Sequence, residues 1–260
     1  MNERKIQLVI PMAGLGKRFV DANYKVLKPL IPIHGVPMIK LVVDNLMSDK
    51  VGHVILIVQR ETIENVNLRE ILAHLSIPLT IVAVESLTEG PADTVRLAKP
   101  VLDNKLPLVV ANSDQFVNAE IDNFYDMLNG NEDSTAILTM EDDDPKWSYV
   151  EIDQGGRVVS VKEKVVISNQ ATVGVYGFSS AQLAWDAFSV MWAKDDRTNG
   201  EFYVAPAYNY VALTDVPIYL INLGPISSVM YGLGTPNDLE LFIENPLSRS
   251  AAEESIRKSR

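Results

Sequence analysis

The residues best suited to chemistry lie in the segment 8–33, LVIPMAGLGKRFVDANYKVLKPLIPI. An apolar run typical of a β-strand ends at Pro11, and the small residues Ala13-Gly14-Leu15-Gly16 follow. Glycines at such a turn allow backbone amides to approach a phosphate closely. Cations come next: Lys17 and Arg18 directly after the turn and, further along, Lys28 before Pro29. A strand, a glycine turn and then cations indicate a polyphosphate site.

Two well-known phosphate-binding motifs do not fit this turn. A P-loop needs a glycine where the chain has Pro11 and a Ser or Thr where it has Arg18. A dinucleotide fingerprint needs a small residue where the chain has Phe19. A β-turn with solvated cations remains the plain alternative for the glycines alone.

Composition narrows the class of protein. The chain has 260 residues, long enough for one large domain, and a net charge of −11, which argues against nucleic acid and anionic membranes as partners. With no cysteine, disulfides and thiolate chemistry are excluded, and the three histidines share no metal-binding spacing. No apolar run reaches the roughly 18 residues of a membrane span, so no membrane insertion and a cytoplasmic location are expected.

Hydrophobic periodicity predicts alternating strands and helices in the first half of the chain. Strands are expected at 8–10, 54–58, 79–84 and 106–110, and helices at 37–49, 61–75 and 92–102. The second half is predicted to be richer in strands, at 135–140, 149–152, 158–162, 172–178, 218–222 and 227–231. Helices are expected there at 120–128, 180–193, 205–212 and 236–244.

This pattern predicts an α/β fold with a Rossmann-like, doubly wound, mostly parallel mixed sheet, helices on both faces and a smaller β-rich lobe. We expect a single domain over residues 1–245, with a first part at about 1–118 and a second, β-rich lobe at about 119–245. The polar tail, 246–260, is expected to be frayed or a short surface helix. Ligands bind beyond the carboxyl ends of the strands in such sheets. Three segments lie there: 13–18, 85–90 and 112–115.

The opening segment resembles the signature of nucleotidyltransferases of the sugar-phosphate type. The matching pieces are Ala13–Arg18 for A-G-x-G-x-R, Lys28-Pro29-Leu30 for K-P-L, and Ile33-His34-Gly35-Val36-Pro37-Met38-Ile39 for I-x-G-x-P-M-I. The resemblance implies the nucleotidyltransferase fold and binding of a nucleoside triphosphate (NTP) near Ala13, Gly14, Leu15, Gly16 and Lys17. It implies catalytic roles for Arg18, which would neutralise the β/γ phosphates, and Lys28, which would bridge donor and acceptor phosphates.

Asp114 lies in the segment Asn112-Ser113-Asp114-Gln115, which follows the fourth predicted strand. A lone aspartate there is usually a turn or cap residue. The resemblance implies instead that its carboxylate is catalytic and holds Mg²⁺. In the loop before the third predicted helix, the resemblance places Glu85 at the base and Gly90 where the nucleoside approaches. An ionised carboxylate accepts hydrogen bonds, so Glu85 would suit guanine, cytosine or adenine better than thymine or uracil. A solvated Glu85 is the alternative.

Two strands of the second half resemble the family's acceptor-binding motifs. Trp147 and Ser148 occupy the positions that border the acceptor sugar, and Glu163 and Lys164 those that bind its hydroxyls and its phosphate. The predicted strand that follows, 172–178, contains Gly174 and resembles the next strand of the family. The period of two places Glu163 on the face opposite Lys164. A core tryptophan and a solvated strand edge are the alternatives for these positions.

The closing motif departs from the family, because its second metal-ligand aspartate is Gly232 here. Either Asp114, phosphates and water hold Mg²⁺ alone, or another carboxylate such as Glu201 replaces the missing one. Next to it, Thr235 and Pro236 have the residue types of a helix N-cap and first turn.

The resemblance implies transfer of a nucleoside monophosphate (NMP) from an NTP to a phosphorylated small molecule, most often a sugar 1-phosphate. The products would be a nucleotide-sugar, for cell-surface polysaccharide synthesis, and pyrophosphate. A glycosyltransferase of GT-A type and a non-catalytic nucleotide or sugar-phosphate sensor are the alternatives. The sequence leaves the NTP, the acceptor and the oligomeric state open, a homo-oligomer included.

Overall fold

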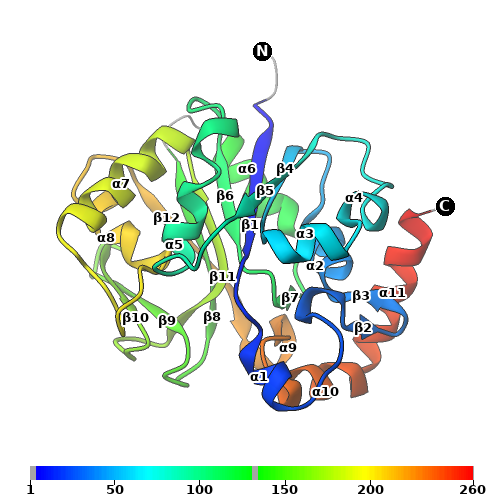
Figure 1. Ribbon diagram of the computed structural model, residues 1–260. Helices are drawn as coiled ribbons and strands as arrows, with labels where there is room; N and C mark the ends of the chain where they lie inside the picture. Colours follow the sequence, from blue (N-terminus) through cyan, green and yellow to red (C-terminus); the bar gives the residue numbers. More distant parts are fainter. Residues whose placement is uncertain (1–3, 131–133, 260) are drawn as a thin grey trace.

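The computed structural model describes residues 4–130 and 134–259. Within them, a nine-stranded sheet runs through the middle of the molecule (Figure 1). Its strand order is β10-β9-β11-β6-β1-β4-β5, and β8 pairs with β11 and with β12. The strands are β1 (Ile6–Met12), β4 (Val51–Gln59), β5 (Leu79–Val84), β6 (Leu108–Ala111), β8 (Thr135–Glu141), β9 (Ser148–Ile152), β10 (Val158–Glu163), β11 (Gln170–Phe178) and β12 (Ile218–Pro225). Two short antiparallel pairs lie outside it: β2 (Pro32–Ile33) with β3 (Val36–Pro37), and β7 (Gln115–Val117) with β13 (Met230–Gly232).

The first half of the chain builds the parallel part of the sheet. β1 pairs in parallel with β6 on one side and β4 on the other, and β4 pairs in parallel with β5. The second half adds β11, β9 and β10 by antiparallel pairing, whereas β12 joins β8 in parallel. The sheet is therefore mixed, and the predicted fold class is confirmed.

Helices cover both faces of this sheet (Figure 1). They are α1 (Lys17–Asp21), α2 (Met38–Leu46), α3 (Arg60–Asn65), α4 (Leu68–Ile71), α5 (Pro91–Arg96), α6 (Ile121–Gly130), α7 (Ala181–Ala193), α8 (Tyr208–Val211), α9 (Ile226–Val229), α10 (Pro236–Glu244) and α11 (Pro246–Lys258). Three 3-10 helices are η1 (Lys28–Leu30), η2 (Lys99–Val101) and η3 (Ala205–Ala207). In the part of the chain so described, none of these helices has the length and apolarity needed to cross a membrane.

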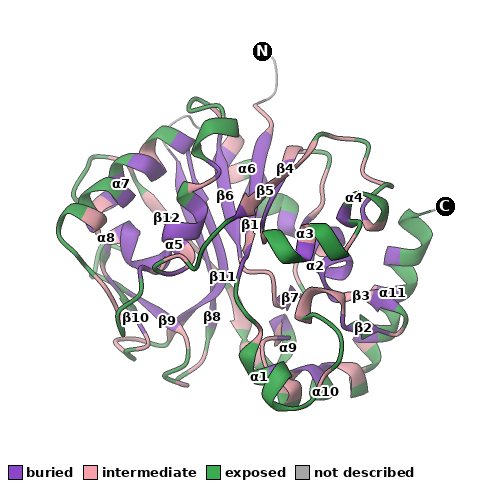
Figure 2. Ribbon diagram, in the orientation of Figure 1, coloured by how far each residue is buried: buried purple, intermediate pink, exposed green. Residues whose placement is uncertain are grey.

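Strand alternation divides the core into two layers. In β1, Leu8 and Ile10 pack on the side of α2 and α6, while Val9 packs on the side of α5 and α7. All of these side chains are fully buried, and the central strands are buried along their length (Figure 2). The run 54–58 in β4 is likewise buried on both faces, as its unbroken apolar sequence predicts.

Three predicted elements differ in detail from those observed. The helix expected at 61–75 is divided into α3 and α4, because Asn67 leaves the helical conformation and its side chain accepts a hydrogen bond from the Glu70 amide (3.2 Å). The helix expected at 92–102 ends at Arg96 and is followed by η2, which contains Pro100. The strand expected at 227–231 begins only at Met230, since α9 precedes it.

The C-terminal segment, expected to be frayed or a short surface helix, is a helix that belongs to the folded body. It forms the 13-residue helix α11, which packs against α2 and α10. Ser248, Ala252 and Ser255 are buried in that contact. The helix α10 before it begins as the sequence predicts, with the Thr235 side chain accepting a hydrogen bond from the Asp238 amide (3.1 Å).

Candidate active site

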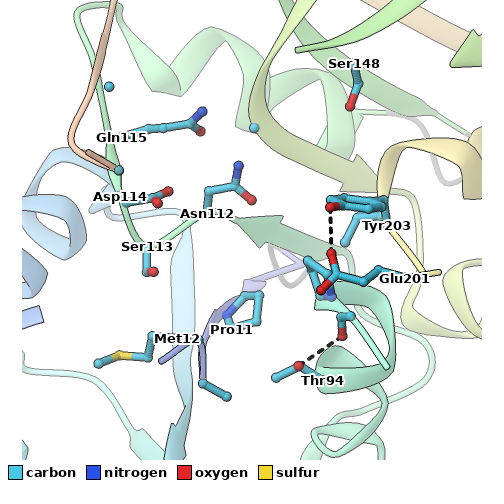
Figure 3. Close-up of a pocket in the computed structure, with 18 of the residues that line it drawn as sticks. Pro11, Met12, Thr94, Asn112, Ser113, Asp114, Gln115, Ser148, Glu201 and Tyr203 are labelled. Atoms are coloured by element: carbon cyan, nitrogen blue, oxygen red, sulfur yellow. Dashed lines mark hydrogen bonds between the residues drawn. The ribbon is translucent and has the colours of Figure 1, made fainter. Parts of the chain in front are cut away.

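A cleft of about 510 Å³ opens at the carboxyl ends of β1 and β6, which is where an open α/β sheet binds ligands. It is bordered by the turn after β1, by the segment 112–115 after β6, and by parts of the β-rich half (Figure 3). Most of the predicted site residues line it: Ala13, Gly14, Gly16, Arg18, Lys28, Gly90, Asp114, Trp147, Ser148, Glu163, Lys164 and Gly174. The side chains of Leu15, Lys17 and Glu85 are not among the lining residues.

Lys28 and Asp114, which are 86 residues apart in the chain, meet in this cleft. The Lys28 Nζ donates a hydrogen bond to Asp114 Oδ2 at 2.5 Å. Both side chains are partly exposed, at 19% and 30%, so solvent and ligands can reach them. A cation and a carboxylate held together at the floor of a cleft can bind a phosphate and a divalent cation side by side.

The turn after β1 places Lys28 and Arg18 on the same cleft. Gly16 has a φ of +60°, and a Cβ at this position would lie 3.1 Å from the Cβ of Lys28, so the turn passes directly over the lysine. Phe19 is buried and packs edge-on against Tyr24 with ring centroids 5.1 Å apart, which anchors α1. Arg18 lines the cleft beside it. The phenylalanine that excludes a dinucleotide fingerprint is therefore the anchor of this turn.

Glu85 does not reach the cleft, contrary to the sequence-based expectation. Its carboxylate accepts hydrogen bonds from the Arg60 guanidinium, one of them from Nε at 2.6 Å, and its side chain is 64% exposed. The hydrogen bond from Arg60 lowers the pKa of Glu85 below its ordinary value. The bidentate pair with arginine therefore holds the carboxylate outside the cleft.

We expect Glu85→Gln to leave the order of preference among the four NTPs unchanged, because the side chain lies outside the cleft. The measurement is kcat/KM for ATP, GTP, CTP and UTP with a fixed acceptor, for the wild type and the variant. A shift of tenfold or more between any two nucleotides would show that Glu85 reads the base after all.

Gly90 is required by a close approach of two backbones. Its φ is +122°, and a Cβ there would lie 2.6 Å from the carbonyl oxygen of Phe202. Backbone groups on both sides of Gly90 pair with Phe202. The Ala92 N–H donates to the Phe202 carbonyl (2.9 Å), and the Phe202 N–H donates to the Glu89 carbonyl (2.7 Å). Gly90 thus joins the first half of the chain to the segment that contains Glu201 and also lines the cleft.

Ser148 and Glu163 form a cross-strand pair at the other end of the cleft. They are directly opposite each other in the antiparallel β9–β10 ladder, and the Ser148 hydroxyl donates to the Glu163 carboxylate. Glu163 is only 8% exposed. Burial raises its pKa above the ordinary value, an effect that the Ser148 hydrogen bond and the Lys164 charge oppose.

Lys164 lies on the same side as Glu163, and here the period-two expectation was wrong. The strand ends at Glu163, and Lys164 has a φ of +58°, which turns its side chain back into the cleft. Its Nζ is 3.8 Å from Glu163 Oε1 and donates to the Tyr203 hydroxyl at 2.5 Å. That hydroxyl donates in turn to Glu201 Oε2 at 2.6 Å.

We expect Glu163→Gln to change how stability depends on pH. A carboxyl whose pKa is raised in the folded state binds more protons there than in the unfolded chain, so stability falls as pH rises from about 4.5 toward the raised value. The variant lacks this fall, so its stability relative to the wild type should increase from pH 4.5 to pH 7.5. Urea unfolding at the two pH values measures the difference, and a constant or decreasing difference contradicts the assignment.

Trp147 borders the cleft and is held by the acidic turn before it. Its indole Nε1 donates to Asp142 Oδ2 at 2.5 Å, and the Lys146 Nζ lies 4.7 Å from the centre of its ring. The turn is closed by Asp144, whose carboxylate accepts from the Lys146 amide (3.0 Å), which lowers the pKa of Asp144. The acidic triplet 142–144 therefore lies in the loop between β8 and β9, where it also fixes the tryptophan.

Because Gly232 has no side chain to bind a metal, a divalent cation in the cleft would depend on other residues. Among the described residues, no three acidic or histidine side chains form a cluster able to bind a metal. Mg²⁺ commonly takes one or two carboxylates plus phosphates and water, and the partly exposed Asp114 carboxylate in the cleft fits that role. A Cβ on Gly232 would lie 3.6 Å from Asp238 Oδ2, which accepts from the Thr235 hydroxyl. Glu201 is instead hydrogen-bonded to Tyr203.

Tyr176, Tyr203 and Asp238 line the cleft but were not assigned to it from the sequence, whereas Thr88, Asn112 and Gln115 belong to the expected segments 85–90 and 112–115. Asn112 and Gln115 flank the predicted Asp114, so their place beyond a strand end was the available signal. Tyr203 lies beside Phe202, whose backbone pairs with that of Glu89 at the cleft.

Comparison with known families gives the class of protein to which this fold and cleft belong. The sequence model of the nucleotidyl transferase family matches residues 8–201, and the chain belongs to this family. A search of curated proteins finds no significant match.

Three solved structures are similar over nearly the whole chain. A nucleoside-diphosphate-sugar pyrophosphorylase from Vibrio cholerae has a TM-score of 0.80 at 25% identity, covering 92% of this chain and 100% of that one. A putative glucose-1-phosphate thymidylyltransferase from Bacillus anthracis has a TM-score of 0.75 at 19% identity, covering 94% and 95%. The inositol-1-phosphate CTP transferase of T. maritima has a TM-score of 0.74 at 15% identity, covering 98% of each chain. The last two likenesses show the shared fold.

Proposed function

We propose that this protein transfers NMP from an NTP to a phosphorylated small molecule of the sugar 1-phosphate type. The products are a nucleotide-sugar and pyrophosphate. The observation that supports this best is the 2.5 Å contact of Lys28 with Asp114 in a cleft that Arg18 and Lys164 also line. Family membership supports the reaction class, and the similarity to a nucleoside-diphosphate-sugar pyrophosphorylase supports the sugar-phosphate acceptor. The reaction would take place in the cytoplasm. Its nucleotide-sugar product would serve the synthesis of cell-surface polysaccharide.

In this reaction, a phosphate oxygen of the acceptor attacks the α-phosphorus of the NTP. The new bond joins that oxygen to the α-phosphorus. The bond between the α-phosphorus and the oxygen that bridges it to the β-phosphorus breaks, and pyrophosphate leaves with that oxygen. Two anions must meet, so positioning and charge neutralisation are the main requirements. Lys28 would bridge the two phosphates, Arg18 would neutralise the leaving pyrophosphate, and Lys164 would hold the acceptor phosphate.

The remaining groups of the cleft would orient the substrates. The amides of the glycine turn, Gly14 to Gly16, would donate to the NTP phosphates. Trp147 and Ser148 would border the acceptor, and Glu163 would accept from its hydroxyl groups. Asp114 would hold Mg²⁺ with phosphate oxygens and water completing the coordination, and the cation would neutralise phosphate charge.

Pyrophosphate release tests the proposal. The purified protein is incubated with each of four NTPs and a panel of hexose, heptose and inositol phosphates and choline phosphate, with Mg²⁺ or with EDTA. We expect release that needs one NTP, one acceptor and the metal together.

The same assay separates the two alternatives. A GT-A glycosyltransferase would consume a nucleotide-sugar and release no pyrophosphate, and its D-x-D metal motif is absent from Asp114-Gln115-Phe116. A sensor would bind an NTP or a sugar phosphate without turnover. No pyrophosphate with any pair would overturn the proposal.

A further inference from the structure

The acceptor end of the cleft contains a glutamine that no part of the proposed reaction uses. Gln115 begins β7 directly after Asp114, lines the cleft and is only 8% exposed. Its side-chain carbonyl oxygen has no hydrogen-bond partner among the described residues. A buried, unpartnered amide carbonyl is unfavourable in the free protein, and a ligand that donates a hydrogen bond relieves this.

The fold makes room for this amide at one position of β11. Gly174 has a φ of +73°, and a Cβ there would lie 1.9 Å from Gln115 Oε1 and 2.4 Å from Asn112 Nδ2. The β11–β8 register shifts between Thr172 and Tyr176, around this glycine. The irregular strand therefore brings the side-chain amides of Gln115 and Asn112 to one place in the cleft. At the same place, the backbone N–H of Asn112 donates a hydrogen bond to the Gly174 carbonyl (2.9 Å). Figure 3 shows Asn112 and Gln115 together above Ser113 and Pro11.

The surroundings favour an acceptor with several hydrogen-bond donors. Ser148 and the buried Glu163 lie on the adjoining strands, and Thr172 lies two residues before Gly174, all lining the same cleft. These groups are hydroxyls, amides and one carboxyl, which match the hydroxyls of a sugar or cyclitol.

The same surroundings disfavour a quaternary ammonium such as choline. Such a group is usually bound by open aromatic faces. Here the Lys164 Nζ lies 4.3 Å from the centre of the Tyr203 ring, and the Lys146 Nζ lies 4.7 Å from that of Trp147. Both rings already carry a cation, which would repel a second one.

We propose that Gln115 determines acceptor specificity by accepting a hydrogen bond from a hydroxyl of the acceptor, and that the acceptor is a polyhydroxylated phosphate ester and not choline phosphate. This inference rests on the proposed function. It adds that one particular hydroxyl is recognised in the pocket formed by Gln115, Asn112 and Gly174.

The first test uses the wild-type protein. Once the panel has given the best acceptor, kcat/KM is measured for each monodeoxy analogue of it. We expect one analogue to fall by roughly 10–100-fold, the effect of leaving a buried carbonyl unpaired. Equal activity with all analogues, or a preference for choline phosphate, would overturn the inference while leaving nucleotidyl transfer intact. No turnover with any acceptor would overturn the proposed function itself.

The second test uses Gln115→Leu and, as a less disruptive replacement, Gln115→Met. Each should lower kcat/KM for the full acceptor roughly 10–100-fold and leave it unchanged for the one analogue that the wild type discriminates against. Gln7→Met is the matched control, because Gln7 is also buried but is bonded to the backbone of Asp103 away from the cleft. The control should keep the discrimination. A uniform loss across all acceptors in both Gln115 variants would contradict the assignment.

Discussion

Replacing Lys28 by methionine is expected to lower kcat by roughly 10²–10³, the loss seen when one preorganised donor is removed from a catalytic site. The methionine keeps most of the side-chain volume but not the charge that lies 2.5 Å from Asp114 Oδ2. Without it, the acceptor and donor phosphates meet with less neutralisation. Steady-state kinetics with saturating NTP and acceptor give kcat directly.

The matched control for this variant is Lys25→Met in the same loop. Lys25 is exposed and does not line the cleft, so its replacement should leave kcat within about twofold. Near-full turnover by Lys28→Met would refute the role of this lysine, and an equal loss in both variants would indicate a general effect on the loop.

Replacing Asp44 by alanine is expected to lower the free energy of unfolding by about 3–5 kcal/mol, because it leaves a buried lysine without its counter-charge. Asp44 is 4% exposed and accepts hydrogen bonds from Lys40 (2.5 Å), His74 (2.6 Å) and the Ser255 hydroxyl. The cluster joins α2 to α11. At about 2–4 °C per kcal/mol, Tm should fall by roughly 6–20 °C.

Two further variants separate the charge effect from simple loss of an aspartate. Asp126→Ala removes an exposed carboxylate that pairs with Lys50 at 3.2 Å, and should change stability by less than about 1 kcal/mol. The double variant Lys40→Met, Asp44→Leu removes both charges and should recover much of the loss. If Asp44→Ala is as stable as Asp126→Ala in urea unfolding, the buried cluster does not hold α11 in place.

Much of the fold follows from local sequence pattern. The unbroken apolar run 54–58 predicts a strand covered on both faces, and β4 is such a strand. Thr235 and Pro236 predict the start of α10 to the residue. Such features depend on neighbouring residues alone, so the sequence contains all of the needed information.

The site is predictable where a motif names the residue, and less so where tertiary contacts decide. Lys28 and Asp114 were expected in one cleft, and their contact agrees with that expectation. Lys164 was placed on the wrong face because its positive φ ends the strand alternation. Glu85 was expected at the base, but Arg60, 25 residues earlier, binds it.

Long-range packing explains the other omissions. Lys40 and Asp44 lie off the apolar stripe of α2, and nothing in that spacing indicates that Ser255, 211 residues after Asp44, covers them. The environment of Gln115 likewise depends on Gly174 in a distant strand. Both contacts require the assembled fold.

In the proposed reaction, one cleft brings the phosphate of an acceptor onto the α-phosphorus of an NTP. The most direct test of this reaction uses an acceptor whose phosphate oxygens are labelled with ¹⁸O, with the products followed by ³¹P NMR. We expect the label to stay in the nucleotide-linked product, including its bridging oxygen, and the released pyrophosphate to contain none. Label in the released phosphate species, or NTP consumption without a nucleotide-linked product, would contradict the proposed reaction.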